Sequence, residues 1–530
     1  MKNRRIVIPA LILLGLVTLF IIVYVLPCYI GLNPGVRSEN TICNSPYHLL
    51  LPKSDALIRF QPPNSRDPIK SHAIPQHPHM ASNAGNNMHN DAYMSDAYTV
   101  SGPDGNEYRI TSRTQGFGGY GTLAFDRHGR IVAVHSSGRK FQLELMDPVT
   151  LEELGSYNLP ARPWYFLLQG IPPWKYIGAG MYFFLDNDNK AVIPTTNNSI
   201  QVVQVPQKDN DQEFRLLKEY DLQEFVVQLP WPRNDSVAWV LPEWSGRSYW
   251  FATTQGVVGK IDLANGQIST MQLDGEIIEN SFAVGEDGIY ILSDKAMYRF
   301  NQNAVGIIYI DWRTSYDRGP ASKPGHITRG SGTSVTLTGN ENGYVVITDN
   351  AEPLIHVQFI RRSDGEIVCS VPVFEDGRSG TDISLIGFEH GDRNSKGINT
   401  YSVIVENNWG HHKFPFAFPE PGIARIDMIE NEVGTKCQLI WSTDEKNIGV
   451  FKLALGNGLL YLYFRDESVI LPKWYLTAID FSTGTTVYKQ LVGTGIGYNN
   501  WAGSIFLHPD GGRLYSTTIF GLVMVEDRMD

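Results

Sequence analysis

The stretch SIFLHPDGGRLYSTTIFGLVMV, residues 504–525, decides the fold. It contains three short apolar runs, Ser504–Leu507, Leu514–Thr518 and Gly521–Val525, and Pro, Asp and Gly separate the first two. Short runs bounded by such residues predict antiparallel strands joined by tight turns. Three strands at the end of a chain leave one exposed edge, which folded proteins avoid. We expect the strand around Glu107 to Ser112 to pair with this edge, so that the two ends of the domain meet.

The same pattern repeats upstream at a spacing of about 40 to 50 residues, the range typical of propeller blades. Innermost strands are expected to start near Gly121, Gly180, Ser236, Ser281, Ser334, Ile383, Phe451 and Ser504. Turns between first and second strands are expected at 126–130, 186–190, 286–288, 339–343, 456–458 and 508–512. The sequence therefore predicts an all-β propeller of about eight four-stranded blades over residues 98–530. Seven blades stay an alternative, because residues 161–175 are irregular and an insertion at 391–399 obscures one boundary.

A second repeated phrase marks the turn between third and fourth strands. It occurs as Asp147-Pro148-Val149-Thr150, Asp262-Leu263-Ala264-Asn265-Gly266 and Asp480-Phe481-Ser482-Thr483-Gly484. In these phrases the chain resembles quinoprotein-like propellers, which bind pyrroloquinoline quinone, and it has a secondary similarity to calcium-dependent lactonase and gluconolactonase propellers. The resemblance covers the chain from about Tyr98 to its end. It implies an architecture more than an activity, because its motifs are turn residues.

The N-terminus predicts a membrane anchor. Residues 1–5 are basic and residues 6–30 form an uncharged apolar run, near the ~20 residues that a bilayer-spanning helix needs. The run is longer than the core of a cleaved signal peptide. Basic residues before a span keep the short N-terminus in the cytoplasm. We therefore expect a single-pass protein whose propeller lies in the periplasm or in an extracellular or lumenal space.

Residues 31–97 are rich in Pro, Asn, Ser and His and lack sustained periodicity, so they are predicted to be an extracytoplasmic linker. Part of this linker, residues 86–96, concentrates Asn, Asp and His and is expected to cap one mouth of the propeller. Four histidines, His72, His77, His79 and His89, fit no compact metal motif.

Charge and cysteine content narrow the class of protein further. The chain of 530 residues has a formal net charge of -11 and lacks a clustered basic surface, so nucleic acid is not an expected partner. Four cysteines suit an oxidising compartment. Cys369 and Cys437 lie in predicted outer strands of neighbouring blades, where either a disulfide or two separate buried thiols would suit the sequence.

In a propeller the second strands end, and the first strands begin, on the same face. Polar residues at these corners predict a ligand-binding mouth. The mouth candidates are Thr195, Asn197, Asp294, Asn408, Asn500 and Trp501. Asn, Asp, Thr and Ser also end strands for local reasons of backbone hydrogen bonding, which accounts for about half of such positions.

Three function classes follow from this mouth. The first is a propeller that binds a small molecule or a protein without chemistry of its own. The second is a calcium-dependent hydrolase of lactones or esters, with Glu279, Asn350, Asn407 and Asn499 as metal ligands and His135 or Asp349 as the base. The third is a quinone-dependent dehydrogenase, against which the lack of an adjacent cysteine pair counts. The sequence favours binding and does not decide whether the protein is an enzyme.

Overall fold

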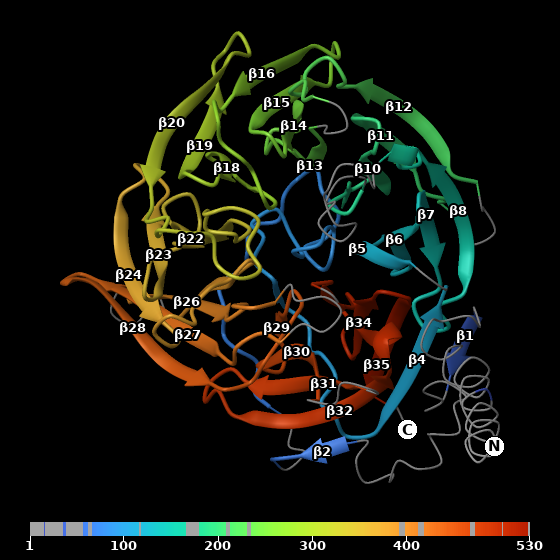
Figure 1. Cartoon of the computed structure of the whole chain (residues 1–530), viewed down its shortest axis with the longest axis vertical. Coiled ribbons are helices and arrows are strands. Elements are labelled where there is room, and N and C mark those ends of the chain that lie inside the picture. The colour runs from blue at the N-terminus through green and yellow to red at the C-terminus, as the bar shows by residue number, and fades with distance from the viewer. Residues whose placement is uncertain are drawn as a thin grey trace, which may run out of the picture.

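Tight turns join short strands into eight four-stranded units, which surround one axis in the computed structural model (Figure 1). The structure describes residues 15, 35–38, 57–61, 66–115, 118–165, 180–207, 213–230, 235–391, 398–411, 418–466, 472–500 and 502–527. The predicted eight-bladed, all-β propeller is confirmed, and the seven-bladed alternative is wrong. The predicted membrane span, residues 6–30, lies outside the described residues apart from Gly15. In the part of the chain that is described, no helix has the length and apolar character of a membrane span.

Each blade is numbered in chain order, with its innermost strand first. Blade 1 contains β5 (Gly119–Phe125), β6 (Ile131–Ser137), β7 (Lys140–Met146) and β8 (Glu153–Leu159), and blade 2 contains β9 (Phe184–Leu185), β10 (Lys190–Pro194), β11 (Ser199–Gln204) and β12 (Arg215–Asp221). Blade 3 contains β13 (Val237–Pro242), β14 (Ser248–Thr253), β15 (Val257–Asp262) and β16 (Ile268–Gln272), and blade 4 contains β17 (Ala283–Gly285), β18 (Gly288–Leu292), β19 (Ala296–Gln302) and β20 (Ile308–Ser315).

The remaining blades continue around the ring. Blade 5 contains β21 (Thr336–Thr338), β22 (Tyr344–Thr348), β23 (Ile355–Arg361) and β24 (Ile367–Val373), and blade 6 contains β25 (Ile386–His390), β26 (Asn399–Glu406), β27 (Ile423–Asn431) and β28 (Gly434–Thr443). Blade 7 contains β29 (Lys452–Ala454), β30 (Leu459–Arg465), β31 (Lys473–Asp480) and β32 (Thr486–Thr494). A short 3-10 helix (Ile496–Tyr498) leads into blade 8, which contains β33 (Ile505–Leu507), β34 (Arg513–Thr518) and β35 (Gly521–Asp527).

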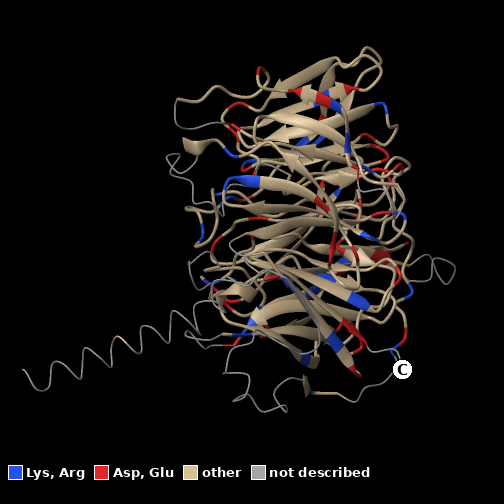
Figure 2. Ribbon diagram, turned by 90° about the vertical axis from the view of Figure 1, so that its right-hand side faces the viewer, with Lys and Arg blue, Asp and Glu red and all other residues tan. Residues whose placement is uncertain are grey.

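Burial decreases from the axis outward and explains the composition of the strands. Every residue of β13 is buried between neighbouring blades, whereas β16, the outer strand of the same blade, is half exposed. Central strands can therefore be apolar on both faces, while outer strands alternate. Acidic and basic residues are interspersed along the flank of the ring (Figure 2).

Blade 8 is closed by a strand from the beginning of the domain, as predicted. β4 (Tyr108–Thr114) pairs antiparallel with β35, from Gly521 opposite Thr114 to Asp527 opposite Tyr108. β1 (Gly35–Ser38) extends this sheet beyond β4, and β2 (Leu57–Arg59) extends blade 7 beyond β32. These pairings cover two outer edges that would otherwise expose unpaired backbone groups.

A disulfide joins blades 5 and 6. Cys369 on β24 and Cys437 on β28 are bonded, with their Cα atoms 6.3 Å apart. Both strands are the outermost of their blades, so the bond links two neighbouring blades at the circumference of the ring.

Residues 81–101, here called the plug, run along the central channel. Residues 85–98 are buried without interruption. Backbone carbonyls of the plug accept hydrogen bonds from seven blades: Gly85 from Phe125, Asn86 from Leu185, Ala92 from Val284, Tyr93 from Leu337, Ser95 from Gly387, Asp96 from Leu453 and Ser101 from Gly512. A two-residue strand within it, β3 (Ala97–Tyr98), pairs parallel with β29. The plug lies mostly in the segment that the sequence analysis assigned to a linker, and the structure places it in the core of the propeller.

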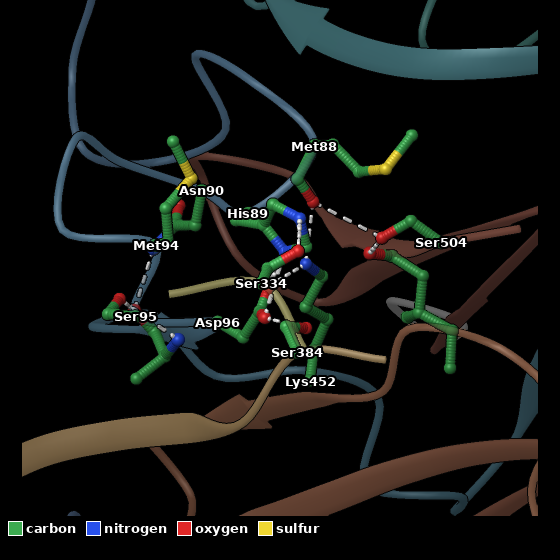
Figure 3. A network of polar contacts seen from close by, with 12 residues as sticks. Met88, His89, Asn90, Met94, Ser95, Asp96, Ser334, Ser384, Lys452 and Ser504 are labelled. Carbon is green, nitrogen blue, oxygen red and sulfur yellow. Dashed lines mark hydrogen bonds and ion pairs between the residues drawn. The ribbon is translucent and has the colours of Figure 1, made fainter. Parts of the chain in front are cut away.

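An ion pair lies at the centre of the plug (Figure 3). The Lys452 ammonium donates to Asp96 Oδ1 and, at 2.7 Å, to the Met88 carbonyl, and both charged side chains are fully buried. His89 Nδ1 lies 3.1 Å from Asp96 Oδ2, and Ser384 Oγ donates to that same oxygen. Burial acts to raise the pKa of the Asp96 carboxyl, but Lys452 and His89 outweigh it and hold this pKa below its ordinary value. The pair therefore connects the plug to blades 6 and 7.

We predict that Lys452→Met destabilises the protein by about 3–5 kcal/mol, because it leaves the Asp96 carboxylate buried without its cation. Urea unfolding measures the change. Lys140→Met, on the exposed start of β7, is the matched control and should change stability by less than about 0.5 kcal/mol. The double variant Lys452→Met/Asp96→Asn should recover part of the loss. A loss below about 1 kcal/mol in the single variant would contradict the role of this pair.

Candidate functional site

Polar side chains from several blades meet at the face where the innermost strands begin. We call the site formed by Tyr182, Glu279, Asn280, Asp382, Glu406, Asn408 and His411 the mouth. Tyr182, before blade 2, points its hydroxyl at Asn280 Oδ1, 3.5 Å away. Asn280, before blade 4, donates from Nδ2 to the backbone carbonyls of Gly332 and, at 3.3 Å, Asp382. The entries to blades 2, 4, 5 and 6 are therefore directly connected.

Asp382 lies at the centre of these contacts. Its Oδ1 is 3.5 Å from Nδ1 of His411, which follows β26 in the same blade. The negative charge of Asp382 contributes to raising the pKa of Tyr182, Glu279 and Glu406, after the larger effect of burial in each case. These three groups therefore share one electrostatic environment although they come from blades 2, 4 and 6.

Glu279 contributes a buried acceptor to the mouth. Its side chain is only 9% exposed, and Oε1 has no hydrogen-bond partner among the described residues. Burial, with a smaller effect from Asp294 and Asp382, raises the pKa of its carboxyl to about 7, although hydrogen bonds from Thr328 oppose the shift. A buried carboxyl oxygen without a donor is costly to the folded protein, so this position suits a ligand that supplies one.

Glu406 is a second buried carboxyl, but its oxygens are occupied. Asn408 Nδ2 donates to Oε1 at 2.7 Å, and Asn447 Nδ2 donates to Oε2. Burial raises its pKa to about 8 despite these two amides. Asn408 in turn accepts from Thr381 Oγ1 at 2.9 Å. Glu406 thus holds the loops of blades 6 and 7 together at the mouth.

The four predicted calcium ligands have different surroundings. Asn350 Nδ2 donates to three carbonyls of residues 318–329, and Asn407 Nδ2 donates to the carbonyls of Arg378 and Pro421, so both hold long loops in place. Among the predicted ligand atoms, Glu279 Oε1 and Asn350 Oδ1 have no partner within the described residues, whereas Asn407 Oδ1 accepts from two backbone amides. Asn499 is buried at the end of the 3-10 helix. In the described residues no three His, Cys, Asp or Glu side chains are grouped closely enough to hold a metal ion.

The two predicted bases are engaged within their own blades. Asp349 accepts from the backbone amide of His356 at 2.7 Å and from its ring at 2.9 Å, which closes the turn between β22 and β23. His135 lies 3.4 Å from Glu144, and burial lowers the pKa of its imidazole to about 4. Neither side chain has a contact with the mouth residues defined above in the described structure.

The remaining mouth candidates mostly make local contacts. Thr195 and Asn197 bond to each other and to Ser199 across one turn. Asp294 pairs with Arg318 at 2.7 Å. Asn500 donates to Ser516, and its Oδ1 has no partner within the described residues. Trp501 lies outside the described residues.

Sequence reasoning missed Tyr182 and the central position of Asp382. Tyr182 lies just after the strand start predicted near Gly180, where a tyrosine is expected to be a core residue of the strand. Asp382 directly precedes the strand start predicted near Ile383, but which corners approach one another depends on how the loops fold over the ring. The His411–Asp382 contact likewise needed the structure, since the path of the chain after β26 decides where His411 lies.

Fold and site together define a closed, eight-bladed β-propeller with a plugged channel and an acidic mouth. No protein-family model matches the chain. A relative from Archaeoglobus fulgidus, described as an uncharacterized protein, is 24% identical over 309 residues, which are 51% of this chain. The match spans 57% of that relative, so the chain covers little more than half of its length.

Solved structures with a similar fold include the WD40 domain of SCAP from fission yeast, with 9% identity and a TM-score of 0.43 over 77% of this chain and 95% of that one. Another is the β-propeller domain of Cps50 (Swd1) from Myceliophteria thermophila, with 10% identity and a TM-score of 0.33 over 63% of this chain and 95% of that one.

We predict that Glu279→Gln stabilises the protein at pH 8 by about 1–3 kcal/mol in metal-free buffer. Because the pKa of Glu279 is raised in the folded protein, the folded protein still holds this proton between about pH 4.5 and about pH 7, whereas the unfolded chain has released it. The free energy of unfolding therefore falls as the pH rises through this range. The variant lacks this fall, so its advantage should be largest above pH 7 and disappear below about pH 4.5. Urea unfolding at pH 4.5 and pH 8 measures both values.

The exposed Glu224→Gln serves as the control and should follow the parent at both pH values. A Glu279→Gln protein that is less stable than the parent at pH 8 would mean that the ionised carboxylate is stabilised within the protein. The proposal of a free acceptor would then fail.

Proposed function

We propose that this protein is a membrane-anchored, extracytoplasmic propeller that binds a ligand carrying positive charge or hydrogen-bond donors at its mouth. The observation that carries the proposal is Glu279 Oε1, a buried acceptor without a donor in the described structure. Burial of a polar atom is tolerated when a partner satisfies it. A bound ligand would provide that partner.

The composition of the mouth supports a cationic or donor-rich ligand. Asp382 and Glu279 influence each other electrostatically, and Asp294 adds a third nearby carboxylate. The plug fills the channel, so a ligand would rest on this face of the ring and would not pass through the axis. The binding group is therefore small enough to reach Glu279 between the loops, whether it belongs to a small molecule or to a side chain of a protein partner.

Hydrolysis is the second candidate, supported by the contact between His411 and Asp382. A carboxylate beside a histidine orients the ring and favours its protonated form, which is how a general base is commonly supported. In this alternative, a calcium ion at Glu279 would polarise the ester or lactone carbonyl. His411 and Asp382 would hold and move the proton of the attacking water.

We predict that a cation binds at Glu279 and raises the unfolding midpoint of the protein. The probes are calcium chloride, spermidine and pyrroloquinoline quinone, each added to the chelator-treated full chain during thermal unfolding. Either cation should raise the midpoint of the parent and of Glu224→Gln, and neither should raise that of Glu279→Gln, because ligand binding stabilises the folded state only when the site exists.

Each other outcome has a defined meaning. No shift with either cation contradicts the cationic ligand. A calcium shift with lactone hydrolysis that is lost in His411→Gln favours the hydrolase. A shift of the unfolding midpoint with the quinone alone favours the dehydrogenase that the resemblance to quinoprotein-like propellers implies.

The anchor makes a separate prediction. The full chain should sediment with membranes and resist extraction at alkaline pH, because a span of about 20 apolar residues inserts stably. A variant lacking residues 1–30 should be soluble, with the same unfolding midpoint. Recovery of the full chain in the soluble fraction would contradict the anchor and leave the mouth unaffected.

A further inference from the structure

A hollow lies between blades 3 and 4, on the face opposite the mouth. It is formed by the turns between first and second strands and between third and fourth strands of both blades, at residues 243–248, 262–267, 285–288 and 301–306. In an antiparallel blade these turns lie at the end opposite the connection between second and third strands. Its volume is about 520 Å³, within the range of sites for small ligands. We call it the groove.

The floor of the groove is held by a chain of hydrogen bonds between the two blades. Lys260 of blade 3 donates to Gln302 Oε1 of blade 4, and Gln302 Nε2 donates back to Glu243 Oε2 in blade 3. Trp250 Nε1 also points to this carboxylate, at 3.5 Å. The floor is therefore fixed before a ligand arrives, which reduces the entropy lost on binding.

Lys260 is an unusual group to find in this floor. Its side chain is 4% exposed, and the described residues place no carboxylate oxygen within salt-bridge distance of its ammonium. Its partner in the floor, Gln302, is a neutral amide. An ammonium with three donors retains capacity for an acceptor on a ligand.

The rim adds further donors. Asn265 and Asn303 use Oδ1 to accept backbone amides, from Gln267 at 2.7 Å and Ile307 at 2.9 Å, so each keeps an Nδ2 donor for solvent or a ligand. Arg247 is exposed at the same rim. Acceptors are present as well, because the carboxylates of Glu243 and Glu286 line the hollow.

The groove is therefore lined by hydrogen-bond donors and by acceptors. Some of these side chains are positively charged and others negatively charged, so that their charges nearly cancel. A hydroxyl group both donates and accepts, so a ligand with many hydroxyls matches this surface, whereas an anion would meet Glu243, Glu286 and Asp262 and a cation would meet Lys260 and Arg247. Trp244 adds a half-buried indole to the wall, braced by the His77 ring at 4.7 Å. Exposed Val305 at the rim offers an apolar contact for the C–H groups of a pyranose ring.

From these contacts we infer that the groove between blades 3 and 4 is a carbohydrate-binding site. It is independent of the proposed function of the mouth, since no residue is shared between them. The site binds a neutral oligosaccharide through Lys260, Arg247 and the two amides, with Trp244 against one sugar face.

The test uses the chelator-treated full chain on a broad array of immobilised glycans, with a peptide array run in parallel. Binding of a neutral glycan, measured again in solution by calorimetry, is expected. Arg247→Ala and Asn303→Asp should each weaken it by about tenfold or more, because each removes donors while Asn303→Asp retains Oδ1 for the turn.

Two controls separate this site from the rest of the molecule. Arg127→Ala changes an exposed arginine in the corresponding turn of blade 1 and should leave affinity unchanged. Glu279→Gln should also leave it unchanged, so that failure of the mouth proposal and failure of the groove proposal are distinguishable. The inference is overturned if no neutral glycan binds, if peptides bind in place of glycans, or if binding survives both groove variants.

Discussion

The buried pair of Asp96 and Lys452 is the interaction on which the arrangement of the ring depends. Two opposite charges at full burial are stable only when each satisfies the other and further hydrogen bonds complete them. Here the further bonds come from His89, Ser384 and the Met88 carbonyl. Because these groups belong to the plug and to different blades, the pair fixes where the blades sit relative to the axis. A propeller with an empty channel would lack this contact between its blades and a central segment.

The plug also determines where function can lie. Because the plug fills the channel, ligands can bind on either face of the ring but cannot pass along its axis. The polar side chains on the two faces differ in kind. The mouth contains carboxyls with raised pKa values, Glu279 and Glu406. The groove on the other face is rich in donors around Lys260. The two sites are therefore suited to ligands of different chemistry.

Much of the fold could be predicted because turn residues act locally. Asp and Gly in phrases such as residues 480–484 set the hairpins, and their spacing predicted about eight blades, with seven as an alternative. The closing strand near Glu107 followed from a missing partner for β35. The plug could not be predicted in this way, because its Asn and Asp side chains bond mainly within the plug and show no period, while its backbone carbonyls bind distant blades. Its composition is that of an exposed linker, and only the structure shows it buried.

The candidate site was predicted less well for a related reason. Corner residues share one face, but which of them touch depends on loop paths over the ring. Asn350 and Asn407 have side-chain oxygens that could bind calcium, but their amide groups hold loops in place. Tyr182 and Asp382 meet Asn280 across blades 2, 4 and 6, a contact that no spacing in the sequence announces.

The position of the plug before the first blade has a consequence for how the protein is made. Residues 81–101 leave the ribosome ahead of every blade, and β4 follows directly after them. β4 waits for a partner that is synthesised last, since it pairs with β35, whereas the plug binds blades from the first to the last. The blades must therefore assemble around a segment that has already been synthesised. The ring stays open between its last and first blades until β35 has been synthesised and can pair with β4.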